Sequence, residues 1–375
     1  MPTVGPGPYR EPVSTRWRIE RVDVAPAGEP PWRVLGAQAA LAQDTLDQWG
    51  FEDWAWNAAE LMAVLRRAEY ERCELLVALD PDAPDGDPDG VVGGLIVELP
   101  LADNTSFISG NVWARPGTDC RAALLDAALE LAADAGRSTF LLETDHLPAG
   151  PGAELLEPRS GVGRIAADAL TELAISRGFE LEQVERISTF PFPADDDALR
   201  ALREDAAAHA GSEYAVHTWQ DSTPEQWLDS LAALIGRMST DAPLAGIDIE
   251  PEDWDAARVR SRDAERTKKG RGALAVVAEH VPSGELAAFT ELEWPLARPE
   301  VAYQHDTLVA GPHRGRRLGM LVKTTQLLEL GRLRPQLRRL HTWNASENRH
   351  MLAINEAVGF AVTGYSGEWQ RILDR

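Results

Sequence analysis

The segment with the clearest chemical potential runs from His305 to Lys323 and reads HDTLVAGPHRGRRLGMLVK. A short apolar strand leads into a loop of small and basic residues, and that loop leads directly into a helix. A helix that starts there points several backbone N–H groups and the positive end of its dipole at one spot. Arginine side chains add full charges at the same spot, so the segment predicts a site for a phosphate-bearing ligand.

The basic residues of this region are a local exception in an acidic chain. Eight Lys or Arg and a single acid, Glu329, lie between His313 and Arg339, whereas the whole chain has a formal net charge of −23. The arginines at the helix start are expected to bind phosphate, and those from Arg332 to Arg339 are expected to form a solvated face. A chain this acidic repels nucleic acid and anionic membranes, and it favours cationic partners such as small amines.

Length and composition predict a soluble protein of two domains. The chain has 375 residues, of which 44% are hydrophobic and 26% charged, and no apolar run approaches the roughly 20 residues of a membrane span. Two distant cysteines, Cys73 and Cys120, form neither a metal pattern nor a disulfide framework, so we expect a reducing cytoplasm. Within the acidic run Asp80–Gly90, the residues from Asp85 onward match the start of a calcium-binding loop. The twelfth residue counted from Asp85 is Ile96 where such a loop needs Glu, so we expect an exposed hairpin loop and no metal.

The chain repeats one order of elements twice. Each half is expected to contain two helical segments, a pair of strands, a helix, a strand, another helix and a final strand, and the second half has a third strand before the helix that follows its strand pair. In the first half we expect helices at 34–49, 57–70, 121–135 and 165–177, and strands at 91–100, 107–113, 139–144 and 183–192. In the second half we expect helices at 224–238, 251–266, 318–330 and 348–358, and strands at 273–279, 286–294, 301–309, 339–343 and 361–371.

This order predicts an α/β fold of two tandem domains, each a mixed, mostly antiparallel sheet flanked by helices. The boundaries place the first domain at 1–193 and the second at 213–375. The Asp- and Ala-rich segment 194–212 shows no face suited to a core, and we interpret it as a partly helical linker.

The second half resembles the GNAT superfamily, the Gcn5-related N-acetyltransferases. The family's acyl-CoA motif is Gln/Arg-x-x-Gly-x-Gly/Ala at a helix start, and Arg314–Gly319 matches it with Arg317 at the inner glycine. The pattern His-Arg-Gly-x-Arg-Leu-Gly-x-x-x-Lys from His313 to Lys323 is similar to that of an actinobacterial-type subgroup, as are the residues Thr342-Trp-Asn344, Asn348, Met351, Asn355 and Gly359-Phe360. The first half resembles the family only in its element order, so the whole chain looks like a tandem GNAT protein.

The resemblance implies an acyl-CoA site, with acetyl-CoA as co-substrate and no metal. Acyl-CoA would lie in a V-shaped gap between strand 303–309 and the strand near 340–344, and its pantetheine would pair with the backbone of Leu308 and Val309. The backbone N–H groups of residues 315–319 would receive the pyrophosphate. The cofactor-binding residues expected from the resemblance are Thr307, Leu308, Val309, Arg314, Gly315, Arg316, Arg317, Leu318, Gly319, Met320, Asn344, Asn348 and Met351.

The first half departs from this pattern at the matching junction, 112–121. Pro116 removes one N–H donor there, and Asp119 places an anion where the phosphate would lie. We therefore expect a degenerate domain that keeps the fold without a working CoA site and that supports the structure or lines the acceptor pocket.

Transfer of an acetyl group to an amine requires a deprotonated amine close to the thioester carbonyl and a proton donor for the leaving thiolate. In many family members a Tyr gives that proton, and the resemblance aligns it with Asn355, which can still form a hydrogen bond near the sulfur. His305, Tyr303 or a water are the nearby replacements. The candidate bases are Asp306, Glu291 and Glu293.

Strand alternation predicts that Glu291 and Glu293 lie on one face of their strand, and that Asp306 and His305 lie on opposite faces of the next strand. His341 and His350 are expected at the surface. In the segment 224–266, which the resemblance places at the acceptor wall, we expect core aromatic and solvated acidic residues, namely Trp227, Trp254, Asp248 and Glu252.

These features predict an acyl-CoA-dependent N-acyltransferase for a small, possibly cationic primary amine, working by direct attack in a ternary complex. The alternatives are a catalytically silent acyl-CoA-binding or scaffold protein, and an enzyme with another acceptor or a longer acyl donor. We expect a monomer or a homodimer that binds neither nucleic acid nor membrane.

Overall fold

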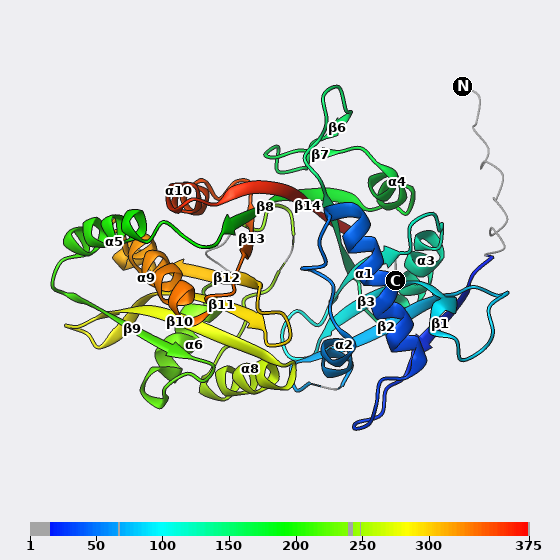
Figure 1. Cartoon of the computed structure of the whole chain (residues 1–375), viewed down its shortest axis with the longest axis horizontal. Helices are drawn as coiled ribbons and strands as arrows, with labels where there is room; N and C mark the ends of the chain where they lie inside the picture. The colour runs from blue at the N-terminus through cyan, green and yellow to red at the C-terminus, as the bar shows by residue number, and fades with distance from the viewer. Residues whose placement is uncertain (1–15, 67, 239–242, 248, 374–375) are drawn as a thin grey trace, which may run out of the picture.

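A computed structural model describes residues 16–66, 68–238, 243–247 and 249–373 (Figure 1). The elements of the first half are β1 (Arg18–Val22), α1 (Trp32–Trp49), α2 (Ala58–Leu65), β2 (Glu71–Leu79), the 3-10 turn η1 (Pro88–Gly90), β3 (Val91–Pro100), β4 (Phe107–Ala114), α3 (Arg121–Asp134), β5 (Thr139–His146), β6 (Leu155–Leu156), β7 (Ile165–Ala166), α4 (Ala169–Ser176) and β8 (Glu180–Pro191).

The elements of the second half are α5 (Asp196–Ala210), β9 (Tyr214–Gln220), η2 (Glu225–Trp227), α6 (Leu228–Gly236), α8 (Ala256–Lys268), β10 (Arg271–His280), β11 (Glu285–Pro295), β12 (Val301–Val309), η3 (Gly311–His313), α9 (Leu318–Leu333), β13 (Arg339–Ala345), α10 (Arg349–Val358) and β14 (Ala361–Ile372). None of the helices in the described ranges combines the length and apolar character that a membrane crossing requires.

One twelve-stranded sheet runs through both halves in the order β1-β2-β3-β4-β5-β14-β8-β13-β12-β11-β10-β9. Its neighbours are antiparallel except for β4 with β5 and β12 with β13, which are parallel. The α/β fold class agrees with the sequence prediction, but that prediction missed β1 and β9, the two outermost strands of the sheet.

The final strands of the two halves are exchanged. The last strand of the chain, β14, pairs with β5 of the first half, whereas β8, the last strand of the first half, pairs with β13 of the second half. The two exchanged strands also pair with each other. In Figure 1 they cross between the two lobes, so each half completes the sheet of the other.

The two faces of the sheet are covered by different helices. In the second half, Leu340 of β13 packs with Leu327 of α9, whereas Leu308 of β12 packs with Leu231 of α6. In the first half, α3 covers one face and α1 with α2 covers the other. We call the side covered by α1, α2, α6 and α8 the α8 face, and the side covered by α3, α9 and α10 the α9 face.

The linker segment is more ordered than the sequence suggested. Nearly all of it forms helix α5, whose residues Leu199, Ala206 and Ala210 are buried against the core beside α9. The expectation of no core-forming face was wrong, because the face consists mainly of alanines, whose small side chains suit close helix contact but give a weak hydrophobic signal.

Other boundaries moved for local reasons. Helix α2 ends at Leu65, earlier than expected, and the segment expected to begin a helix at Ile165 starts with the short strand β7, so that α4 begins at Ala169 with an Asp168 cap. The acidic segment before β3 forms the expected hairpin connection between β2 and β3.

Candidate functional site

The predicted phosphate loop lies between β12 and α9. Its three arginines, Arg314, Arg316 and Arg317, are all exposed, and the helix begins at Leu318. The N-cap Arg317 supplies no side-chain acceptor to the first turn, so the N–H groups there have no side-chain cap. Gly315 has a φ of 81°, which favours glycine.

Arg317 itself has a φ of 55°, an unusual value for a residue with a side chain. Its guanidinium pairs with Asp205 of α5. Arg317 is therefore drawn toward the linker helix, and Arg314 and Arg316 lie on the loop beside it. Behind the loop, the start of α9 packs closely against α10. A side chain at Gly319 would crowd this contact, because its Cβ would lie 3.1 Å from Ile354 of α10.

A gap opens between β12 and β13 next to this loop. The parallel pairing starts at Val301 with Arg339 and stops at Gln304 with Thr342, although both strands continue beyond it. On its other edge, β12 remains paired with β11 through Thr307, Leu308 and Val309. The edge of these three residues that faces the gap is therefore not paired with β13, as the resemblance required for pantetheine.

A β-bulge at the start of the gap changes the predicted faces. Thr290 of β11 pairs with Thr307, and Leu292 pairs with Gln304, so Glu291 faces both His305 and Asp306. The extra residue breaks the two-residue alternation of β12. The prediction of His305 and Asp306 on strictly opposite faces was therefore wrong, and Asp306 lies within electrostatic reach of His305 and Glu291.

Glu291 is held by two arginines of α8. Arg266 Nη1 donates to Glu291 Oε1 at 2.7 Å and Arg262 Nη2 donates to the same oxygen at 3.1 Å. Burial alone would raise the pKa of Glu291, but the two guanidinium groups outweigh it and lower the pKa to about 2. A carboxylate this acidic is a poor proton acceptor, so the arrangement does not suit Glu291 to be the general base.

Glu293 is paired with Arg271 and with His305, whose Nε2 lies 3.1 Å from Glu293 Oε1. Burial would raise the pKa of Glu293, but His305 and the arginines hold it well below its usual range. The side chain of His305 is 41% exposed and lines a cavity, so Glu293 orients a histidine that a ligand can reach. Burial raises the pKa of Asp306.

Tyr303 does not take part in this group. Its ring is 7% exposed, and its hydroxyl donates to the backbone oxygen of Asp53 in the loop after α1. Burial raises the pKa of Tyr303 to about 12. The hydroxyl is thus committed to a contact between the two halves.

The cavity that His305 lines has a volume of about 520 Å³ and lies on the α8 face. Both halves supply its walls. They include Trp56, Glu60, Tyr70, Glu98 and Ser109 from the first half, and Glu252, Trp254, Arg258, Arg262, Arg266, Lys269, Arg271, Glu293 and His305 from the second. Of the residues expected near the acceptor wall, Trp254 and Glu252 line it, Trp227 is buried in the core, and Asp248 lies outside the described residues.

Asn355 lies on the α9 face beside the gap. Its Nδ2 donates to Asn344 Oδ1 at the end of β13, and its Oδ1 accepts from Lys323 Nζ, both at 2.6 Å. Asn348 instead caps α10, because its Oδ1 accepts from the backbone N–H of Met351 at 3.2 Å. The structure thus brings the predicted residues Asn344 and Asn355 together and gives Asn348 a local structural contact.

His341 was expected at the surface, and this expectation was wrong. It is fully buried, with Nε2 2.8 Å from Asp53 Oδ2 and Nδ1 2.9 Å from Thr189 Oγ1. Arg339 also donates to Asp53, with Nη2 2.8 Å from Oδ1. Burial would raise the pKa of Asp53, but these hydrogen bonds lower it to about 2.

Sequence reasoning missed Asp53, although a signal was present. The loop WGFEDWAWN between α1 and α2 carries four aromatic residues around this aspartate. A loop so rich in aromatic side chains is typical of a buried contact. In the structure, Phe51 and Trp54 of this loop pack against His341, with ring centroids 5.6 and 5.4 Å apart.

The junction of the first half engages its polar groups internally. Asp119 accepts from the Trp17 indole at 2.7 Å, and Arg121, which opens α3, pairs with Asp44 at 2.5 Å. Both side chains are thus engaged within the first half, and the loss of a CoA site from this junction stays a prediction.

A second cavity, of about 210 Å³, lies at the gap between β4 and β5 on the α8 face. It is lined by aromatic residues of the first half and by carboxylates of β3 and β5, and it shares Trp56, Glu98 and Ser109 with the larger cavity. Burial and neighbouring carboxylates raise the pKa of Glu143 to about 8, and burial raises that of Asp145 to about 6.

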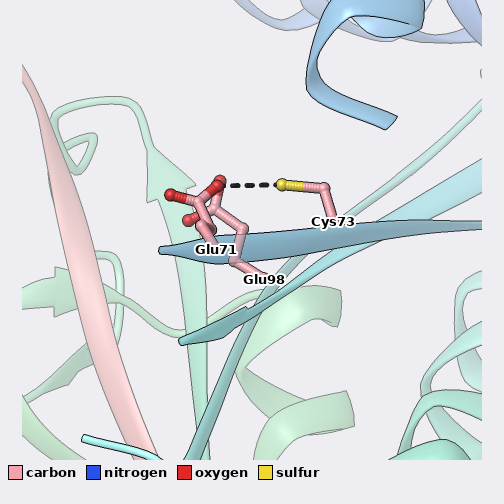
Figure 2. Close-up of side chains that lie close together, drawn as sticks. All are labelled: Glu71, Cys73 and Glu98. Atoms are coloured by element: carbon pink, nitrogen blue, oxygen red, sulfur yellow. Dashed lines mark hydrogen bonds between the residues drawn. The ribbon is translucent and has the colours of Figure 1, made fainter. Parts of the chain in front are cut away.

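Glu98 also belongs to a group with Glu71 and Cys73 (Figure 2). The Cys73 thiol donates to Glu71 Oε1 at 2.9 Å, and burial raises the pKa of this thiol far above its usual range. In these surroundings the protonated thiol is the stable form, and it donates to a carboxylate beside it. The group therefore fits a hydrogen-bonded cluster at the edge of the larger cavity.

Comparison with known proteins gives a match at the level of structure. No family model matches the sequence, and no curated protein matches it significantly. A tandem GNAT protein from the clavulanic acid biosynthesis pathway aligns with a TM-score of 0.69 at 20% identity, covering 96% of this chain and 99% of that one. A GCN5-related N-acetyltransferase from Sphaerobacter thermophilus aligns with a TM-score of 0.58 at 13% identity, covering 94% and 95%.

A GCN5-related glucosamine N-acetyltransferase region of a fungal β-N-acetylglucosaminidase aligns with a TM-score of 0.57 at 14% identity, covering 96% of this chain and 38% of that one. The chain therefore has the tandem GNAT fold, and the predicted resemblance is confirmed at this level.

Proposed function

We propose that this protein is an acyl-CoA-dependent N-acyltransferase that uses acetyl-CoA to acetylate a primary amine of a small, cationic molecule. The observation that carries the proposal is the gap between β12 and β13, which opens beside an uncapped helix start with exposed arginines. The tandem GNAT fold supports it, because proteins of that fold include acetyltransferases.

In this proposal the chain holds the donor on the α9 face. The N–H groups of residues 315–319 and the side chains of Arg314 and Arg316 bind the pyrophosphate, as expected for an anion at a helix N-terminus. The edge of Thr307–Val309 that β13 leaves unpaired, where Arg314 Nε donates to the backbone oxygen of Val309 at 3.3 Å, receives the pantetheine and brings the thioester to the bulge where the two strands separate.

The acceptor amine reaches the thioester from the α8 face. His305 lies at the bulge, lines the larger cavity and is oriented by Glu293. We therefore propose that His305 is the general base that accepts the proton of the attacking amine. Asp306 contributes negative charge beside the same point. The reaction is direct: the nitrogen attacks the carbonyl carbon, and the carbon–sulfur bond breaks.

A cationic acceptor is favoured by the neighbouring carboxylates. The larger cavity shares Glu98 with the smaller one, where Glu143 and Asp145 add further acids. Burial raises the pKa of Glu98 to about 7, with Glu71 adding to the rise, and a positive charge nearby would favour the ionised forms of all three.

Calorimetric titration with acetyl-CoA, followed by an assay of CoA release over amines, aminoglycosides, amino acids and peptides, tests the proposal. Arg314→Ala is expected to weaken acetyl-CoA binding by about 10- to 100-fold, since a charge-assisted hydrogen bond contributes about 1.5–3 kcal/mol. The control Arg332→Ala changes an exposed arginine near the end of the same helix and should bind normally.

Unchanged affinity in Arg314→Ala would reject the assignment of the phosphate site. Tight binding of acetyl-CoA without turnover of any acceptor would favour the second candidate, a silent acyl-CoA-binding protein. That candidate is suggested by Asn355, an amide that cannot donate a proton as a phenol would.

A further inference from the structure

Lys323 is a buried amine without a counter-charge. Its side chain, in the second turn of α9, is 1% exposed and is among the largest fully buried side chains of the described residues. No carboxylate in the described part of the chain forms an ion pair with it. Burying an ammonium group without a partner is costly, and a methionine would fill a similar volume without that cost. An amine at this position is therefore better explained by a chemical role than by packing.

The contacts of Lys323 are few and directional. Its Nζ donates to Asn355 Oδ1 at 2.6 Å, lies 3.9 Å from the sulfur of Met351, and lies 5.3 Å from the ring centre of Phe360. Asn355 in turn donates to Asn344. One hydrogen-bonded chain thus runs from α9 through α10 to the end of β13.

That chain ends at the gap. Asn344 lies two residues beyond Thr342, the last residue of β13 that pairs with β12. Lys323 lies five residues after Leu318, where α9 starts at the phosphate loop. The Asn344 end of this chain is therefore on the α9 face beside the opening that the proposed function gives to the thioester, and Lys323 lies behind it, one hydrogen bond beyond Asn355.

The surroundings tune the amine for proton transfer. Burial lowers the pKa of Lys323 to about 7, so that it gains and loses a proton near neutrality. No charged group on the neighbouring elements compensates. Glu356 of α10 pairs with Arg186 of β8 at 3.2 Å, and His341 of β13 points to Asp53 on the other face.

We propose that Lys323, aimed by Asn355, is the acid that protonates the sulfur of CoA when the thioester breaks. This inference rests on the proposed function. The amine nitrogen attacks the carbonyl carbon, the carbon–sulfur bond breaks with its electron pair on sulfur, and the Lys323 ammonium gives its proton to that sulfur. Neutral Lys323 then recovers a proton from solvent, which balances the proton lost by the acceptor amine.

The test titrates the thiol of bound CoA and needs no acceptor. CoA is bound to the full-length protein, and the ultraviolet absorbance of its thiolate is followed with pH. An ammonium and a thiolate stabilise each other, so the thiolate raises the pKa of Lys323 above its value in the CoA-free protein, and the ammonium persists while the thiol ionises. The wild type should therefore ionise bound CoA at a pH lower by at least about one unit than Lys323→Met, a tenfold difference in ionisation. Arg332→Met, an exposed change on the same helix, should behave as the wild type.

A second variant covers the case in which Lys323→Met does not fold. Asn355→Leu removes the one oxygen of the described residues that accepts from Lys323 while leaving the lysine in place, and it should ionise bound CoA at a higher pH than the wild type does. Identical thiolate titrations in the wild type and the variants would overturn the role of Lys323 and leave the proposed function intact. Failure of the wild type to bind CoA would instead reject the proposed function.

Discussion

The carboxylates on the α8 face should make the protein less stable as pH rises toward 8, and Glu368→Gln should relieve this effect. Glu368 of β14 lies directly opposite Glu143 of β5 in the sheet register. Asp145 of β5 and Glu185 of β8 flank them, each paired with the intervening Ser366 of β14. Like charges directly opposite each other in a sheet are destabilising.

The loss of stability with rising pH follows from the raised pKa values of these carboxyl groups. Burial, together with the neighbouring acids, raises the pKa of Glu143 to about 8 and that of Glu185 to about 7, and it raises that of Glu368 as well. These groups hold protons in the folded protein that the unfolded chain has already released. Their stabilising contribution is complete below about pH 4, the unfolded value, and is lost as pH rises to about 8.

The magnitude can be bounded. Two carboxylates about 6 Å apart at an effective dielectric constant of 20 repel by about 3 kcal/mol. Water reaches these side chains through the cavity, and cross-strand pairs contribute roughly 0.2–1 kcal/mol, so we expect Glu368→Gln to stabilise the protein by about 1 kcal/mol at pH 8. For a chain of this length that corresponds to about 1–2 °C in Tm. At pH 5, where the folded protein keeps these protons, the gain should vanish.

Scanning calorimetry at pH 5 and pH 8 measures this difference. Glu130→Gln removes an exposed acid from α3, so it lowers the net negative charge equally without touching the group. A Glu368→Gln variant no more stable than Glu130→Gln at pH 8 would show that these carboxylates do not repel one another in the folded state.

Two further predictions concern buried ion pairs. Asp53→Asn should destabilise the protein by about 2 kcal/mol in urea unfolding at pH 8, because Arg339 and His341 lose a charged acceptor. Glu291→Gln should cost about 2–3 kcal/mol in the same assay, because Arg266 loses its nearest carboxylate and keeps only the longer pairs with Glu293 and Asp263. A loss below 1 kcal/mol in either variant would contradict these assignments.

The backbone of the proposed phosphate loop could be predicted because its signal is local. A strand, a glycine-containing basic loop and a helix start are adjacent in the sequence, and the segment 305–323 forms them in that order. The same is true of the hairpin between β2 and β3. In both cases neighbouring residues determine the backbone, so little depends on the rest of the chain.

The bulge and the buried histidine could not be predicted by the same reasoning. Alternation assumes an unbroken strand, and the extra residue at His305 and Asp306 is visible only once β12 is paired with β11. His341 was expected at the surface because a lone histidine carries no burial signal. Its partner Asp53 is 288 residues away in sequence, so only the folded chain reveals the pair.

The exchange of final strands explains why a half without a phosphate loop would be retained. β13 forms one wall of the gap, and on its other side it pairs with β8 of the first half along residues 339–345. Asp53, also of the first half, holds Arg339 and His341 of that strand from the α8 face. The wall of the proposed acyl-CoA gap therefore depends on the first half for its sheet neighbour and for its buried counter-charge, and the acceptor cavity takes part of its lining from the same half. A loss of the phosphate loop from the first half leaves all of these contacts in place, whereas a loss of its final strand would remove the support of the gap itself.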